Sequence, residues 1–64
     1  MSSMSDYEAR EIAVHLVDGG WTSEDKDLFI SENAKMREED VLTEDEIDMV
    51  FREIARIEAE KEEE

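Results

Sequence analysis

Hydrophobic residues recur at helical spacing in the first third of the chain. They stand at positions i, i+3, i+4, i+7 and i+8, and they are Ala9, Ile12, Ala13, Leu16 and Val17. This spacing is typical of an amphipathic helix. Ser5 followed by Glu8 forms a capping box for the start of such a helix. Gly19 stands where a left-handed residue commonly ends one. The pattern therefore predicts a helix over residues 6–18.

A second run at helical spacing lies near the end of the sequence. Its apolar positions are Ile47, Val50, Phe51, Ile54 and Ile57. Thr43 and Glu46 form a second capping box, and Leu42 is placed to pack against the first turn. The pattern predicts a helix that ends at about residue 60. We expect the acidic tail, residues 61–64, to fray because its carboxylates oppose the negative end of the helix dipole.

The segment between the two runs, residues 22–40, is harder to interpret. Thr22 or Ser23 is a suitable helix cap, and acidic residues follow it in the first turn. Three consecutive apolar residues, Leu28, Phe29 and Ile30, would also suit a short buried strand. The acidic first turn and the residues 34–37 favour a helix, followed by a loop at residues 38–40.

Three helices in 64 residues predict an all-α fold, a small three-helix bundle. We expect residues 1–5 to be a flexible N-terminus and residues 6–60 to form one helical domain, followed by the tail. A core this small is marginal. The apolar stripe of the last helix is expected to pack on the first helix, and dimerisation through it or a neighbouring stripe stays open.

Net charge changes this picture most. The chain has 21 acidic and seven basic residues, a net charge of −14. Such a surplus repels nucleic acid and anionic membranes and attracts basic protein surfaces. Residues 38–64 alone hold 13 acidic and three basic residues. If they were helical throughout, they would span about 40 Å, with one carboxylate per roughly 3 Å, close to the ~3.4 Å charge spacing of a DNA strand.

The residues for catalysis or metal binding are largely missing. His15 is the only histidine and there is no cysteine, which excludes Cys–His nucleophiles and thiolate metal sites. Residues 42–53 resemble the entering helix of an EF-hand in calmodulin-like proteins. The required glycine does not follow, however, and the helical pattern continues through residue 57. We expect a protein that is not an enzyme and that uses no cofactor and no metal.

In being tiny, acidic, helical and without catalytic residues, the whole chain resembles the phage-encoded inhibitors of bacterial defence, such as anti-CRISPR and anti-restriction proteins. The resemblance implies an inhibitor or regulator that acts as a DNA mimic on a nucleic-acid-binding protein or effector complex. The candidate partner-binding residues are the carboxylates of the second half with one apolar anchor on the far side of the last helix: Glu38, Glu39, Asp40, Glu44, Asp45, Asp48, Met49 and Glu53.

Two other hypotheses stay open. A small helical adaptor or dimerisation module would use its apolar stripes, and its acidity would only be solubilising. Adaptation to high salt would explain the charge without assigning a function. No apolar run approaches the roughly 20 residues of a membrane helix, and the start lacks the pattern of a signal peptide. We therefore expect no membrane contact and a cytoplasmic location, in the host cell if the protein is phage-encoded.

Overall fold

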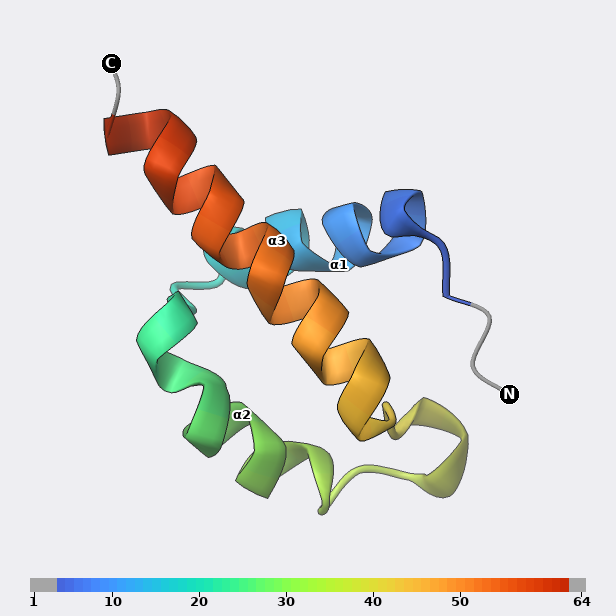
Figure 1. Ribbon diagram of the computed structural model, residues 1–64. Helices are drawn as coiled ribbons and strands as arrows, with labels where there is room; N and C mark the ends of the chain where they lie inside the picture. The colour runs from blue at the N-terminus through green and yellow to red at the C-terminus, as the bar shows by residue number, and fades with distance from the viewer. Residues whose placement is uncertain (1–3, 63–64) are drawn as a thin grey trace.

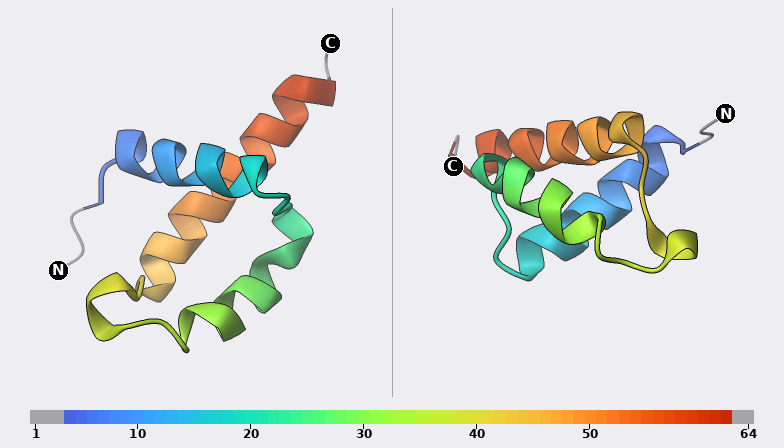
Figure 2. Two further views of the ribbon diagram at one scale, coloured as in Figure 1. Left: turned by 180° about the vertical axis from the view of Figure 1, so that it is seen from behind. Right: turned by 90° about the horizontal axis from the view of Figure 1, so that it is seen from below.

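Three α-helices and two short 3-10 turns make up the computed structural model, which describes residues 4–62. Their order is α1 (Asp6–Asp18), η1 (Ser23–Asp25), α2 (Lys26–Asn33), η2 (Glu38–Asp40) and α3 (Glu44–Glu62). The long α3 crosses α1, and α2 runs beside α3 in the opposite direction (Figures 1 and 2). No strand occurs in residues 4–62. The predicted all-α three-helix bundle is confirmed.

Helix α1 has the predicted bounds. The backbone N–H of Glu8 donates to Ser5 Oγ at 3.2 Å and so caps the first turn. At the other end the N–H of Trp21 donates to the Leu16 carbonyl at 2.9 Å, and the N–H of Gly20 donates to the Val17 carbonyl at 3.0 Å. These bonds form a Schellman motif. The left-handed residue is Gly20, with φ 97°, and not Gly19 as the sequence suggested.

Helix α3 begins with the predicted capping box. The N–H of Thr43 donates to Glu46 at 2.8 Å, and the N–H of Glu46 donates to Thr43 Oγ1 at 3.2 Å. The helix continues to Glu62, two residues beyond the expected end. Residues 63–64 of the predicted frayed tail lie outside the described residues, as do residues 1–3 of the N-terminus. Met4, which was expected in the flexible N-terminus, packs partly buried against the core.

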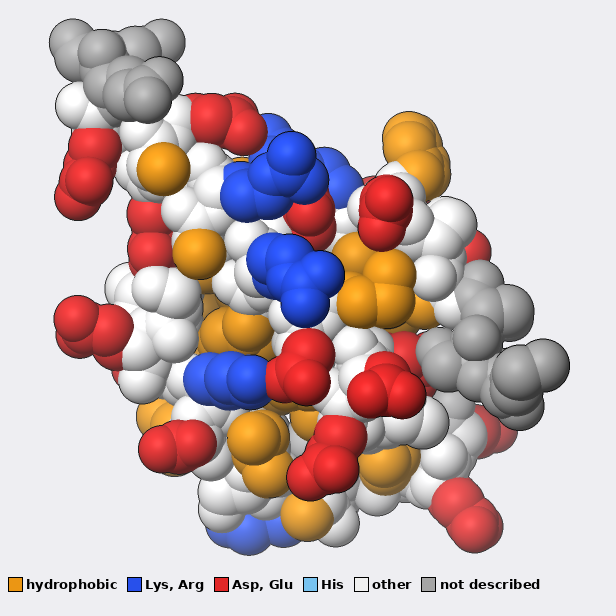
Figure 3. All heavy atoms as spheres, viewed as in Figure 1, with side chains coloured by type: hydrophobic (Ala, Val, Ile, Leu, Met, Phe, Trp, Pro, Cys, Tyr) orange, Lys and Arg blue, Asp and Glu red, His pale blue; other side chains and the backbone are white. Residues whose placement is uncertain are grey.

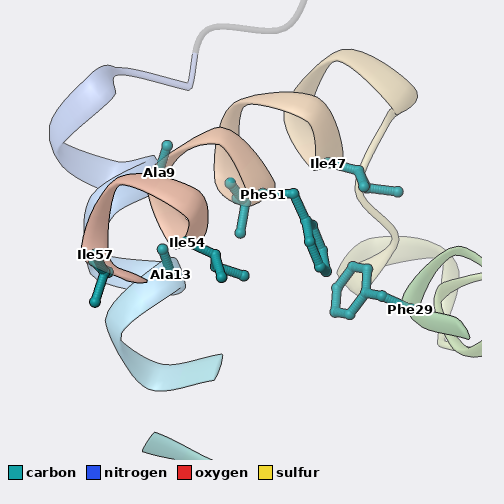
Figure 4. Close-up of a cluster of buried hydrophobic side chains, with 8 residues drawn as sticks. Ala9, Ala13, Phe29, Ile47, Phe51, Ile54 and Ile57 are labelled. Carbon is teal, nitrogen blue, oxygen red and sulfur yellow. The ribbon is translucent and has the colours of Figure 1, made fainter. Parts of the chain in front are cut away.

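The core forms mainly between α1 and α3. Ala9 and Ala13 are buried on α1, and their small side chains let α3 approach closely. The apolar stripe of α3 is buried against them, as predicted (Figure 4). Its members are Ile47, Val50, Phe51, Ile54 and Ile57. The stripe is thus buried within one chain, which is the intramolecular packing that the sequence predicted.

Helix α2 departs from the prediction at its end. It stops at Asn33, so residues 34–36 form a turn instead of continuing the helix. Only Phe29 of the three consecutive apolar residues points inward, because neighbouring helical positions are about 100° apart. The Phe29 ring packs against Trp21 with centroids 5.4 Å apart and against Phe51 at 5.2 Å. Leu28 and Ile30 on either side of Phe29 are exposed, which rules out a buried strand here.

Candidate partner-binding surface

The densest run of carboxylates lies at one end of the molecule, where η2 leads into α3. Residues 38–48 contain seven carboxylates and no basic residue. We call this segment the acidic end; it is the yellow part of the ribbon, between the end of α2 and the first turns of α3 (Figure 1). It comprises a 3-10 turn, an extended link and a helix start. The continuous helix considered for residues 38–64 is therefore not formed.

A buried side-chain amide holds the acidic end in place. Asn33 donates from Nδ2 to the Leu42 carbonyl at 2.9 Å. Its Oδ1 accepts the Leu42 backbone N–H at 3.0 Å. Leu42 itself packs on the core cluster. The link between η2 and α3 is thus fixed to the end of α2 by two hydrogen bonds and an apolar contact.

Most carboxylates of the acidic end face solvent without a counter-charge. Within residues 4–62, no ion pair involves the exposed carboxylates of four residues. They are Glu38, Asp40, Glu44 and Asp45. Glu39 lies 4.0 Å from the exposed Arg37, and a pair so open to solvent contributes little. Asp48 pairs with Lys26 of α2.

The later turns of α3 are different, because basic side chains pair with two of their carboxylates. Glu53 is buried and lies 3.0 Å from Arg56 and 3.6 Å from Arg10 of α1. Arg10 also binds Glu60 through two hydrogen bonds, at 3.0 and 3.1 Å. Lys and Arg side chains accordingly gather over the middle of the face that carries α3 (Figure 3). Glu53 joins α1 to α3 and does not belong to an exposed acidic surface.

Met49 is not on an exposed far side of α3. It is partly buried and packs against the core cluster. A side chain off the main stripe of α3 therefore still contacts the core. Of the eight candidate residues, the structure brings six carboxylates together at the acidic end. Met49 and Glu53 lie outside this surface.

Glu58 has a further structural role. Its Oε2 accepts the Ser23 backbone N–H at 2.9 Å, and its Oε1 accepts the Ser23 hydroxyl at 2.6 Å. The hydroxyl bond first, and then the backbone bond, lower the pKa of Glu58. The bond from Arg10 likewise lowers the pKa of Glu60. These carboxylates attach η1 and α1 to the last turns of α3.

A pH dependence follows from the lowered pKa of Glu58. A carboxylate whose pKa is lower in the folded state stabilises that state above its unfolded pKa and loses this contribution as pH falls. We expect wild type to be more stable than Glu58→Gln by a constant difference above about pH 5. The difference should shrink below about pH 4. Urea denaturation of both proteins across this range measures it, and a difference that does not depend on pH would contradict the assignment.

Other kinds of site find little support in the described residues. No group of three acidic or histidine side chains in residues 4–62 is arranged to hold a metal ion. The helix of residues 42–53 that resembles an EF-hand continues as α3 through the positions where calcium ligands would begin. Within the same residues, no helix has the length and apolar character to cross a membrane.

Comparison with protein family models, with curated proteins and with solved structures finds no match for this chain. From its fold and its surface, the protein is a small all-α protein with one strongly acidic end. Its function has to be argued from that surface.

Proposed function

We propose that this protein is a binding protein whose acidic end occupies a positively charged, nucleic-acid-binding surface of another protein. The observation that carries the proposal is the set of exposed carboxylates at residues 38–48, held in a defined conformation and largely without counter-charges. A basic groove on a partner would supply those counter-charges. In this reading the protein is an inhibitor or regulator, and it has no catalytic role.

The spacing of the carboxylates supports a DNA-mimic mode of binding. Glu44, Asp45 and Asp48 fall within about 6 Å of helix length, at 1.5 Å per residue. One strand of DNA carries a charge every ~3.4 Å. In the later turns of α3, by contrast, Arg10 and Arg56 pair with Glu53 and Glu60, which lowers the density of unpaired charge there. The compositional resemblance to phage inhibitors of bacterial defence favours a nuclease or effector complex as the target.

The proposal predicts which charges matter. The variant Glu38→Gln/Glu39→Gln/Asp40→Asn should lose about tenfold or more in affinity, because it removes three of the clustered charges. Binding by wild type should also weaken as salt rises. The measurement is capture of partners from host extract at low and at high salt, with release by duplex DNA, followed by titration of each partner that mass spectrometry identifies.

A matched control removes the same amount of charge elsewhere. The variant Glu11→Gln/Asp18→Asn/Glu24→Gln changes three exposed carboxylates outside the acidic end. It should bind nearly as well as wild type. An equal loss of affinity in both variants would mean that binding depends on overall charge and not on the acidic end. Binding that neither variant nor salt affects would overturn the proposal.

An adaptor or dimerisation module is the second candidate. One observation favours it: Tyr7 is 78% exposed and Val14 is 48% exposed, seven residues apart on α1. Such a pair could anchor an interface between chains. Loss of binding on Tyr7→Ser/Val14→Ser, with no effect of the substitutions at residues 38–40, would favour the adaptor.

A further inference from the structure

A hollow of about 230 Å³ lies between α2 and the first turns of α3. Aliphatic side chains form part of its lining, and charged side chains form the rest. The lining residues are Lys26, Ile30, Glu44, Asp45, Ile47 and Asp48. Aliphatic and acidic groups thus line the same space, at the border of the acidic end.

Of the two aliphatic side chains in the lining, Ile30 is the one accessible to a ligand. Ile30 is 40% exposed. Phe29 is the side chain of this part of α2 that points into the core, so the neighbouring Ile30 faces solvent beside α3. Ile47 is buried at the base of the first turn of α3. On this face, hydrophobic side chains reach the surface over α2 and beside the acidic end, next to carboxylates (Figure 3).

The charges of the lining indicate what would bind. Lys26 already pairs with Asp48 across the hollow, from α2 to α3. Within residues 4–62, Glu44 and Asp45 take part in no ion pair. An additional cation would therefore meet two carboxylates here. A second copy of the chain is a poor occupant, because each copy carries a net charge of −14.

We propose that this hollow binds one long cationic side chain, lysine or arginine, from a basic partner. The methylene stem packs on the exposed Ile30, beside the buried Ile47, while the charged head reaches Glu44 and Asp45. Long basic side chains bind in this way, burying the stem and leaving the head among polar groups. The inference rests on the proposed function and adds to it a place where the partner's side chain is recognised by shape as well as by charge.

Two basic peptides of the same length and charge test the contribution of the stem. One is an oligolysine, and the other is an oligomer of 2,4-diaminobutyric acid, whose side chain is two methylenes shorter. We expect wild type to bind oligolysine about fivefold more tightly, because partial burial of the additional methylenes adds to the affinity. Fluorescence anisotropy with labelled peptides at low salt and about pH 6 measures both affinities.

Two substitutions on α2 locate the preference. Ile30→Ser should remove the difference between the peptides and leave the salt dependence unchanged. Leu28→Ser is the matched control: Leu28 is more exposed, at 57%, but lines a different hollow beside Trp21. It should keep the difference. Glu44→Gln/Asp45→Asn, at exposed positions, should weaken oligolysine binding, and circular dichroism checks the folding of each variant.

The outcomes separate this inference from the proposed function. One outcome is that wild type binds both peptides with equal affinity and that Glu38→Gln/Glu39→Gln/Asp40→Asn abolishes the binding of both. This would overturn the proposed recognition of a side chain in the hollow and leave the proposed function intact. A preference that Leu28→Ser removes and Ile30→Ser keeps would also overturn it. If neither peptide binds at low salt, the proposed function fails as well.

Discussion

Replacing Ile54 with aspartate is expected to unfold the protein. Ile54 is 0% exposed and is among the largest fully buried side chains of the core. Loss of a large aliphatic side chain from a core costs about 2–5 kcal/mol, and an unpaired buried carboxylate costs more. At about 0.05–0.15 kcal/mol per residue, a chain of this size has only about 3–10 kcal/mol of stability. Far-UV circular dichroism at 25 °C should show loss of the helical signal.

The neighbouring residue provides the control. Ala55 is exposed on the same helix, so Ala55→Asp adds the same charge without burying it. Its expected cost is about 0.7 kcal/mol, from the weaker helix propensity of aspartate. Ala55→Asp should therefore stay folded. A folded Ile54→Asp protein, or equal loss in both variants, would contradict the packing of α3 on α1.

Replacing Asn33 with leucine is expected to have the second-largest effect. The substitution leaves both the N–H and the carbonyl of Leu42 without the partner that Asn33 provides. A buried polar group without a partner costs about 1–3 kcal/mol, so the two together should remove about 2–6 kcal/mol. Urea denaturation gives the loss of stability, and amide hydrogen exchange at Leu42 should become faster.

Ser31→Leu is the control for this substitution, because Ser31 is exposed on the same helix. It should change neither the stability by more than about 0.5 kcal/mol nor the exchange at Leu42. Unaltered exchange at Leu42 in Asn33→Leu would show that the amide does not hold the link. If Asn33→Leu stays folded, weaker partner binding would connect the position of the acidic end to function.

Helix ends with local signals were predictable from the sequence. Thr43 with Glu46 caps α3 through both bonds of the expected capping box, and Ser5 caps α1 through one of them, because the partners lie within four residues. The end of α1 was placed correctly, but the left-handed residue was not. The sequence does not distinguish Gly19 from Gly20, since both lack a Cβ atom.

The end of α2 was not predictable, because its cause is not local. Asn33 bonds to Leu42, nine residues further on, and nothing in the neighbourhood of Asn33 reveals that partner. Residues 34–37 have adequate helix propensity, yet the turn that brings Leu42 to Asn33 takes precedence. Tertiary hydrogen bonds and packing override weak local preference.

The part of the candidate surface that depends only on the density of carboxylates along the chain could be predicted from the sequence. The six candidate carboxylates between Glu38 and Asp48 lie at one end because they are close in sequence. Glu53 was misplaced because its partner Arg10 lies on another helix; Arg56, three residues on, was the one local signal. The exposure of Ile30 was missed because its neighbours Leu28 and Phe29 are equally apolar and only the packed structure shows which one is buried.

The pairing of α1 with α3 also determines when the protein can fold during synthesis. Residues 50 positions apart, Arg10 and Glu60, meet across this interface. The apolar face of α1 therefore has no partner until the ribosome has made α3. Contacts between distant segments slow folding, and exposed apolar surface favours aggregation. Residues 1–43, which are made before α3, hold 11 acidic and four basic residues, and this negative charge opposes aggregation before α3 is available.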